Sequence, residues 1–268
     1  MMAALLIDAL RIPPDARVDQ RIPKKRFVES GAPTAADKRR LLEGIDEATW
    51  RAALKPTNIG VPAWRDGVRQ YEEIEVLSVD LREEAKPARI VELMHRAIPY
   101  PVVLVVQRGA SACLSLAHKR VSLGEAGRFV VESVVTSEFL TTPETATPDT
   151  DTATEDASST GDPLVEPFLE SLELSRQPAR HLEAVYQGWI ERVEGLAAAR
   201  ITGRYVPAAT PAAAQARRAA LAEREELRRE LIRLRQAVRN ETQMSRRVAL
   251  NLEIQRWEQR LAALHAQL

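Results

Sequence analysis

Two histidines stand out as residues that could do chemistry together. His95 lies in ELMHRAIPYP and His118 in SLAHKRV, and we expect both at ends of elements that a β-α-β-β unit brings close. With Arg96, Lys119 and Arg120 nearby, they could form a polar site for phosphate or carboxylate. Alternatively, both imidazoles hydrogen-bond backbone carbonyls and fix the proline-flanked turn, and we favour this second interpretation.

Four carboxylates could hold a metal ion. Glu72, Glu73 and Glu75 lie on one expected strand and Glu132 on a later one. A nuclease-like metal site needs acidic residues and a lysine that converge at a sheet edge. The spacing does not match a compact Asp…Glu-x-Lys pattern, so alternating glutamates on a solvent-exposed face are the simpler interpretation. The best residues for a nuclease would be Glu73, Glu75, Lys119 and His118.

A basic segment, RIPKKRF, spans residues 21–27. It contributes four cations within six positions, which are Arg21, Lys24, Lys25 and Arg26. They could bind phosphates and release counterions, dock on an acidic partner protein, or form a solvated surface. All three interpretations stay open. Known catalytic signatures, such as a P-loop, HExxH or GxSxG, do not occur in the sequence, so we expect no catalytic set, metal or cofactor.

The composition limits the class of protein. The 268 residues include 38 Lys and Arg and 38 Asp and Glu, so the formal net charge is zero. This balance argues against a protein that is basic over its whole surface. A single cysteine, Cys113, excludes an internal disulfide framework and a Cys-rich zinc site. The apolar runs are far shorter than the ~20 residues of a membrane span, and we expect a cytoplasmic protein without membrane contact.

The sequence changes character near residue 141. Residues 141–163 are rich in Thr, Pro, Asp and Glu and have no hydrophobic period, which predicts a disordered acidic linker. The expected organisation is an α/β core domain (1–140), this linker (141–163), amphipathic helices (164–205) and a coiled-coil helix (214–268).

Two segments early in the core show contrasting patterns. Residues 34–54 suit a helix, with Thr34 as N-cap and Asp37 as its capping-box-like partner. Residues 72–83 alternate like a strand, but the parity of the apolar positions changes after Val76, which predicts a bulge.

The clearest helix carries an apolar stripe from Ile90 to Ile98, with Pro87 near its start and Pro99 after its end. Three strands should follow, at 102–107, 112–121 and 128–139. The prediction is an α+β fold, with a mixed β-α-β-β-β sheet that has helices mainly on one face, followed by an all-α part.

A heptad-like stripe dominates the end of the chain and predicts a coiled-coil seam. Its members are Leu250, Ile254, Trp257, Leu261, Leu264 and Leu268. A second stripe, within residues 227–238, is out of phase with it across residues 240–245. One long helix that changes its facing stripe and a hairpin of two helices both fit. Because no Gly or Pro interrupts the segment, we favour one helix.

Several segments together resemble one bacterial family. They are RIPKKRF, TAADKRRLLEGIDEATWRAALKPTNIGVP, QYEEIEVLSVDL, ELMHRAIPYPVVLVV and SLAHKRVS. Over most of residues 5–140 the chain resembles the family catalogued as domain of unknown function 4391, and SRRVALNLEIQRWEQ resembles that family's C-terminal helix. Members are often encoded beside helicases and DNA methyltransferases in restriction-like, phage-defence gene clusters. The resemblance implies such neighbours and no particular activity.

These observations together predict a non-catalytic assembly or adaptor subunit of a phage-defence or restriction-like complex. Its partners would be helicase or methyltransferase subunits, or a second copy bound through the coiled coil, and DNA is a further candidate. Two alternatives remain open, namely a divergent metal-dependent nuclease and a nucleic-acid-binding module without catalysis.

Overall fold

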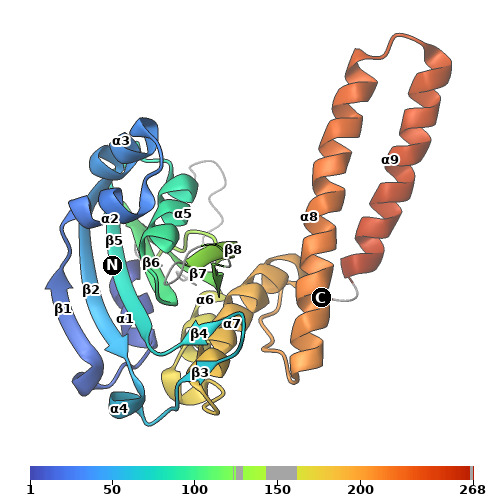
Figure 1. Cartoon of the computed structure of the whole chain (residues 1–268). Coiled ribbons are helices and arrows are strands. Elements are labelled where there is room, and N and C mark those ends of the chain that lie inside the picture. The colour runs from blue at the N-terminus through green and yellow to red at the C-terminus, as the bar shows by residue number, and fades with distance from the viewer. Residues whose placement is uncertain (123, 125–128, 143–161, 266–267) are drawn as a thin grey trace, which may run out of the picture. The chain divides into compact units, whose positions relative to one another are not determined.

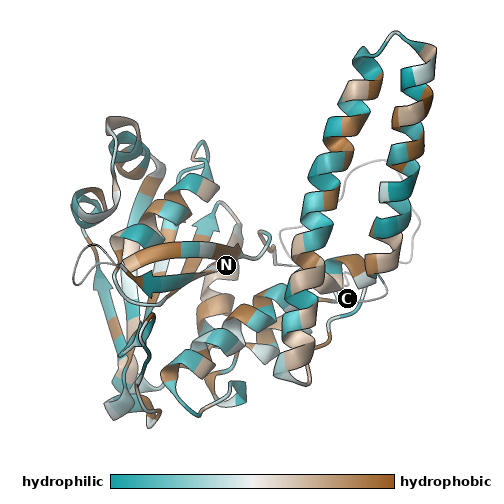
Figure 2. Cartoon of the chain, turned by 45° about the vertical axis from the view of Figure 1, so that its right-hand side comes forward, coloured by the Kyte–Doolittle hydropathy of each residue, from teal (hydrophilic) through white to brown (hydrophobic). Residues whose placement is uncertain are grey.

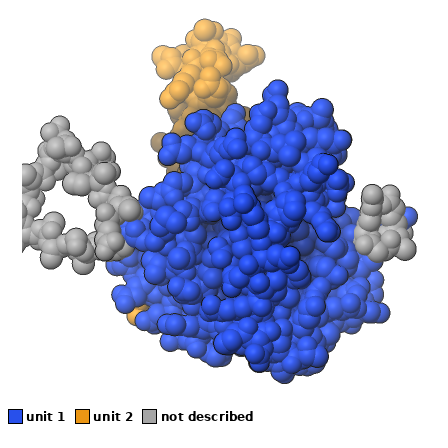
Figure 3. Space-filling view, turned by 90° about the vertical axis from the view of Figure 1, so that its left-hand side faces the viewer, with its two compact units in different colours: residues 1–193 blue, residues 194–268 orange. Residues whose placement is uncertain are grey.

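The chain forms two compact units, Met1–Val193 and Glu194–Leu268 (Figure 3). The computed structural model describes residues 1–122, 124, 129–142, 162–265 and 268. The predicted linker 141–163 therefore lies almost entirely outside the described residues. The residues that follow it, up to Val193, belong to the first unit.

A six-stranded mixed sheet forms the centre of the first unit (Figure 1). Its order is β1-β2-β5-β6-β7-β8, and only β5 and β6 pair in parallel. The strands are β1 (Arg17–Arg21), β2 (Ile45–Leu54), β5 (Ile74–Leu81), β6 (Val102–Arg108), β7 (Ser111–Val121) and β8 (Phe129–Thr136). A separate hairpin joins β3 (Trp64–Arg65) to β4 (Gln70–Tyr71). The expected β-α-β-β-β order is confirmed, with two more strands beside it.

The predicted helix with the clear apolar stripe is α5 (Pro87–Ala97). Its stripe packs into one core cluster with Leu77 and Leu104 of the sheet. Proline occupies the first turn, where its missing N–H costs nothing. The next apolar run, β6, is buried from Val102 to Val106, as expected for a central strand covered on both faces.

The predicted helix over 34–54 is half wrong. Helix α3 (Ala35–Gly44) has the expected cap, because the Thr34 hydroxyl accepts a hydrogen bond from the Asp37 N–H at 3.1 Å. Residues Ile45–Leu54 instead form β2, which pairs with β1 and with β5. Backbone pairing on both sides of the strand outweighs the helix propensity of its alanines.

The predicted bulge lies on the neighbouring strand. Trp50 pairs with Leu77 and Ala52 pairs with Val76, so the extra residue, Arg51, belongs to β2. The β5–β6 pairing is regular. The parity change in β5 follows from burial on both faces, since apolar residues then occupy successive positions.

Helices cover both faces of the sheet, and the expectation of helices mainly on one face is wrong. One face carries α2 (Lys24–Gly31), α3 and α5, whose buried residues share a cluster with the strands. The other carries α1 (Met2–Ala9), which packs against β6, β7 and α6 (Val165–Ser171) (Figure 1). A short helix, α4 (Pro56–Ile59), follows β2.

Helix α7 (Leu182–Thr202) begins in the first unit and fastens its first turns to the sheet. The Tyr186 hydroxyl donates to the Val102 carbonyl at 2.9 Å and accepts from the Ala117 N–H at 2.9 Å. The β6–β7 ladder begins only at Leu104 and Ser115. Tyr186 therefore supplies hydrogen bonds where the two strands do not pair.

The second unit contains an antiparallel helical hairpin, so the preference for one continuous helix is wrong. Helix α8 (Pro211–Asn240) and helix α9 (Met244–His265) flank residues 241–243. The out-of-phase stripes meet by folding back: Leu264 is buried against Ala220 and Leu227, and Trp257, Leu261 and Leu268 pack around them. Figure 2 shows hydrophobic residues along both helices. Two ion pairs join them, Arg235–Glu258 at 2.8 Å and Arg260–Glu223 at 2.6 Å.

None of the helices in the described ranges combines the length and apolarity needed to cross a membrane.

We expect Leu261→Asp to separate α9 from α8. The substitution removes at most about 1.5–3 kcal/mol of apolar burial, since Leu261 is partly buried, and it places an unpaired charge in the seam. Amide hydrogen exchange should show lost protection across 211–265 and unchanged protection in β5 and β6. Leu252→Asp is the matched control, because Leu252 of the same helix is 52% exposed. Full protection of α9 in the Leu261 variant would contradict the seam.

Candidate functional site

A pocket of about 400 Å³ lies in the first unit. Its walls come from the end of β1, from α2, from β2 and β5, and from the turn between α5 and β6. The lining residues with polar or aromatic groups are Gln20, Arg21, Arg26, Phe27, Ser30, Trp50, Glu75 and Tyr100. This volume falls within the range of ordinary small-ligand sites.

Glu75 is a buried carboxyl group that lines this pocket. It is only 6% exposed, and its Oε2 atom has no hydrogen-bond partner among the described residues. The backbone N–H of Glu75 donates to the Pro101 carbonyl at 2.9 Å, which fixes its position. Burial, and then the charge of Glu73, raise the pKa of Glu75 to about 7. Near neutral pH this carboxyl can therefore both accept and donate a hydrogen bond.

Apolar and aromatic side chains surround the carboxyl. Leu77 and Phe27 are each 3% exposed, and Trp50 and Ile98 are half-buried. The Trp50 indole N–H donates to the Ala52 carbonyl at 3.0 Å, so the ring is held in one orientation. The pocket thus offers flat hydrophobic surface beside one polar group.

The basic segment 21–27 divides between the core and the pocket. Lys24 donates to the Ile45 carbonyl, and Phe27 is buried in the core. Arg21 and Arg26 line the pocket. Arg21 also lies 3.5 Å from Glu47, in a pair whose arginine side chain is 70% exposed. Such an exposed pair is weak, so Arg21 remains available to a ligand.

Lys119 lies behind the pocket wall. Its Nζ donates to the Ile98 carbonyl at 2.7 Å and to the Tyr100 carbonyl at 2.6 Å, so it holds the turn that forms one wall. Burial lowers the pKa of Lys119 to about 7. A neutral amine has two N–H donors, which match these two carbonyls.

The structure does not bring His95 and His118 together. His95 is 1% exposed, and its Nε2 lies 3.0 Å from the Ser115 hydroxyl. Burial, and then the charge of Lys119, place the pKa of His95 well below its usual value. Because side chains alternate along β7, His118 lies on the opposite face from Ser115 and Lys119. Lys119 fixes the proline-flanked turn through the Ile98 and Tyr100 carbonyls.

The other candidate carboxylates have cationic partners. Glu72 pairs with Arg65 at 2.8 Å and Glu73 with Lys55 at 3.0 Å. Glu132 pairs with Arg69 at 3.0 Å and with Arg120 at 3.6 Å. Within the described part of the chain, no group of three or more His, Cys, Asp or Glu side chains could hold a metal ion. The four residues named for a nuclease therefore do not converge.

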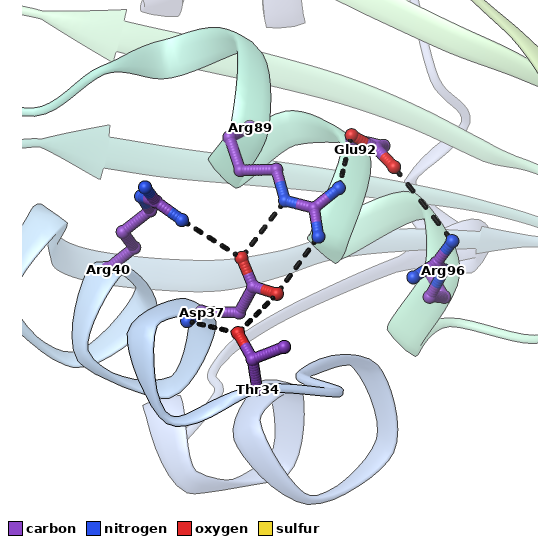
Figure 4. Close-up of polar contacts among 6 residues, drawn as sticks. All are labelled: Thr34, Asp37, Arg40, Arg89, Glu92 and Arg96. Atoms are coloured by element: carbon purple, nitrogen blue, oxygen red, sulfur yellow. Dashed lines mark hydrogen bonds and ion pairs between the residues drawn. The ribbon is translucent and has the colours of Figure 1, made fainter.

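Figure 4 shows an ion-pair network between α3 and α5 that is centred on Asp37. The Asp37 side chain is 3% exposed. It accepts hydrogen bonds from Arg89 at 2.9 and 3.0 Å, from the Thr34 hydroxyl at 2.9 Å and from Arg40 at 3.2 Å. The Arg89 hydrogen bonds are the largest cause that lowers the pKa of Asp37 below its usual range. The network fastens α3 to α5.

Arg96, a predicted binding residue, lies at the far end of this network (Figure 4). Its guanidinium is 3.9 Å from Glu92, which in turn binds Arg89 at 2.7 Å. Arg96 is not among the residues that line the Glu75 pocket.

Sequence reasoning missed this pocket, although one signal pointed to it. Glu75 has the same strand parity as Leu77, Val79 and Leu81, which are all buried. A glutamate at a core-facing position of a strand is unusual. It marked Glu75 as different from Glu72; Glu73 shares the parity of Glu75 but lies before the start of β5.

We expect Asp37→Asn to lower the melting temperature at neutral pH, because Arg89 then loses its carboxylate partner. A depressed native pKa means that the stabilisation is present above the unfolded value of ~3.9. It is lost as pH falls through the lower native pKa. The difference in melting temperature between the two proteins should therefore be largest above about pH 4 and shrink progressively as the pH is lowered below that value. Asp46→Asn, at an exposed pair with Arg82, should have little effect. Equal melting temperatures at pH 7 for wild type and Asp37→Asn would contradict the role of the network.

We expect Lys119→Met to remove a pH dependence of folding. The native amine loses its proton near pH 7 and an unfolded one near ~10.4. The unfolded chain therefore binds more protons between these values, and stability rises with pH there. Urea unfolding at pH 7, 8 and 9 should show a smaller rise for the variant. If the free energy of unfolding rose equally with pH in the wild type and in Lys119→Met, the result would contradict burial of this amine.

Comparison with known proteins gives a family. A family model described as a domain of unknown function, DUF4391, matches residues 10–261. Comparison with the curated proteins and with the solved structures found no match. The matched range includes the sheet, the Glu75 pocket and most of the helical hairpin. The chain therefore belongs to the DUF4391 family.

Proposed function

We propose that the protein is a non-catalytic assembly or adaptor subunit of a bacterial phage-defence or restriction-like complex. It would work in the cytoplasm with a helicase, a DNA methyltransferase or both. The resemblance to a family whose members are encoded beside such enzymes supports the proposal. An exposed apolar surface on α9 gives structural support.

The observation that carries the proposal is an apolar stripe on the outer side of α9. Met244, Val248 and Leu252 follow one another at intervals of four residues and are 72%, 52% and 52% exposed. Residues three or four apart lie on one helix face. The inward seam of α9 already packs on α8, so this stripe is additional to the coiled-coil contact. Adjacent exposed apolar side chains of this kind mark interaction surfaces.

A nuclease is the weaker alternative. Glu73 is neutralised by Lys55, and Glu75 stands in a largely apolar pocket. Lys119 is occupied by two backbone carbonyls, and His118 faces the other side of β7. The remaining alternative, a nucleic-acid-binding module without catalysis, is compatible with an assembly role.

We expect Val248→Asp with Leu252→Asp to weaken recovery of the partner subunit at least about tenfold, since each buried side chain contributes ~1.5–3 kcal/mol. The tagged protein would be co-expressed with the helicase and methyltransferase subunits encoded beside it. The amount of each partner recovered with it would be quantified by gel densitometry. Arg246→Gln with Arg247→Gln is the matched control: both positions are exposed on α9, the net charge changes by the same amount, and both lie about 100° or more around the helix from Val248 and Leu252. Circular dichroism checks folding. Equal recovery with both double variants would contradict the stripe as the docking surface.

A further inference from the structure

We infer that the Glu75 pocket binds a nucleotide, with the base against Trp50 and Glu75 and the phosphate at Arg21 and Arg26. The nucleotide is either a single molecule or the end of a nucleic-acid strand, which present the same chemistry. This inference goes beyond the assembly role and does not depend on it, because the pocket belongs to Met1–Val193 and the α9 stripe to Glu194–Leu268.

The orientation of the ligand follows from one oxygen of the Glu75 carboxyl, Oε2, that has no partner among the described residues. Glu75 is 6% exposed. A buried polar atom without a partner costs stability, and a ligand N–H would satisfy it. The amino-bearing edges of guanine, adenine and cytosine provide such donors. Uracil lacks the amino group and places two carbonyls beside its single N–H, which repel a carboxylate.

The apolar walls suit a flat ring. Trp50, Leu77 and Ile98 line the pocket together with Tyr100. Tyr100 is 39% exposed, so its ring stands at the opening. Stacking of a base on an aromatic side chain contributes ~1–3 kcal/mol. The hydrogen bonds from Trp50 to Ala52 and from Lys119 to the Tyr100 carbonyl hold both walls before any ligand arrives.

Charge at the opening selects against a competing class of ligand. A carboxyl beside two aromatic rings also resembles a site for an ammonium group. However, Arg21 and Arg26 both line the same pocket, and two guanidinium groups repel a cation. They attract a phosphate, which arginine binds through paired N–H donors. An anionic ligand with hydrogen-bond donors on a flat ring fits all three features.

The test measures binding of GMP, AMP, CMP and UMP to the full-length protein by isothermal titration calorimetry. We expect binding of at least one amino-bearing nucleotide, and weaker binding of UMP. Glu75→Gln should weaken that binding at least tenfold above about pH 8, where the carboxyl is ionised, because a neutral amide then replaces a charged acceptor. Arg26→Gln should weaken it and reduce its salt dependence. A ten-nucleotide single strand is the second ligand: tighter binding than the mononucleotide identifies a strand end, and equal binding identifies the free nucleotide.

Lys25→Gln is the matched control. Lys25 is exposed in the same basic segment but does not line the pocket, so its variant should bind like the wild type. Thermal melts show whether each variant is folded, and Glu75→Gln should not be less stable because it replaces a buried acid with a neutral amide. Three results would overturn the inference: no nucleotide binding at millimolar concentration, unchanged affinity in Glu75→Gln, or an equal loss in Lys25→Gln and Arg26→Gln.

Discussion

The buried amine of Lys119 holds the turn between α5 and β6, and the pocket depends on this turn. Two carbonyls, of Ile98 and Tyr100, point at the amine in a region where prolines at 99 and 101 have no N–H to offer. A charged lysine would be costly there, whereas a neutral amine satisfies both acceptors. This turn places Tyr100 beside the pocket and Pro101 beside the backbone of Glu75.

The opposite face of the sheet depends on residues that are distant in the sequence. Tyr186 joins the backbones of Val102 and Ala117, and the Trp189 indole donates to the Leu172 carbonyl at 2.8 Å. Both aromatic residues are fully buried. The segment after the linker-like stretch is therefore part of the core that supports β6 and β7. The pocket lies on one face of the sheet, and the segment up to Val193 helps to cover the other face.

The two proposed roles use different physical features of the chain. The hairpin buries one stripe of α9 against α8 and leaves Met244, Val248 and Leu252 outward, which suits contact with another protein. The pocket combines a buried acid with two arginines at its opening, which suits a small anionic ligand. An assembly subunit that also senses a nucleotide would combine recognition of a partner and of a ligand in one chain.

Local sequence patterns predicted those elements whose buried face can be read from the spacing of their own apolar residues. The Thr34 cap, α5 and β6 were predicted correctly because caps and apolar stripes are properties of neighbouring residues. The two out-of-phase stripes at the end of the chain were also visible in the sequence. The sequence did not determine whether they pack against each other in a hairpin, because that depends on contacts between residues far apart in the chain. Ile45–Leu54 became a strand because β1 and β5 pair with it on both sides.

Tertiary structure decided which of the candidate residues share one site. His95 of α5 packs on the face of β7 that carries Ser115, and His118 lies on the other face. Arg26, Trp50, Glu75 and Tyr100 come from four separate parts of the chain to line one pocket. The sequence determined each residue's chemistry and its parity along a strand. The register of the sheet and the helices that cover it decided which side chains of each strand face the pocket. These long-range contacts determine which side chains are left without a protein partner.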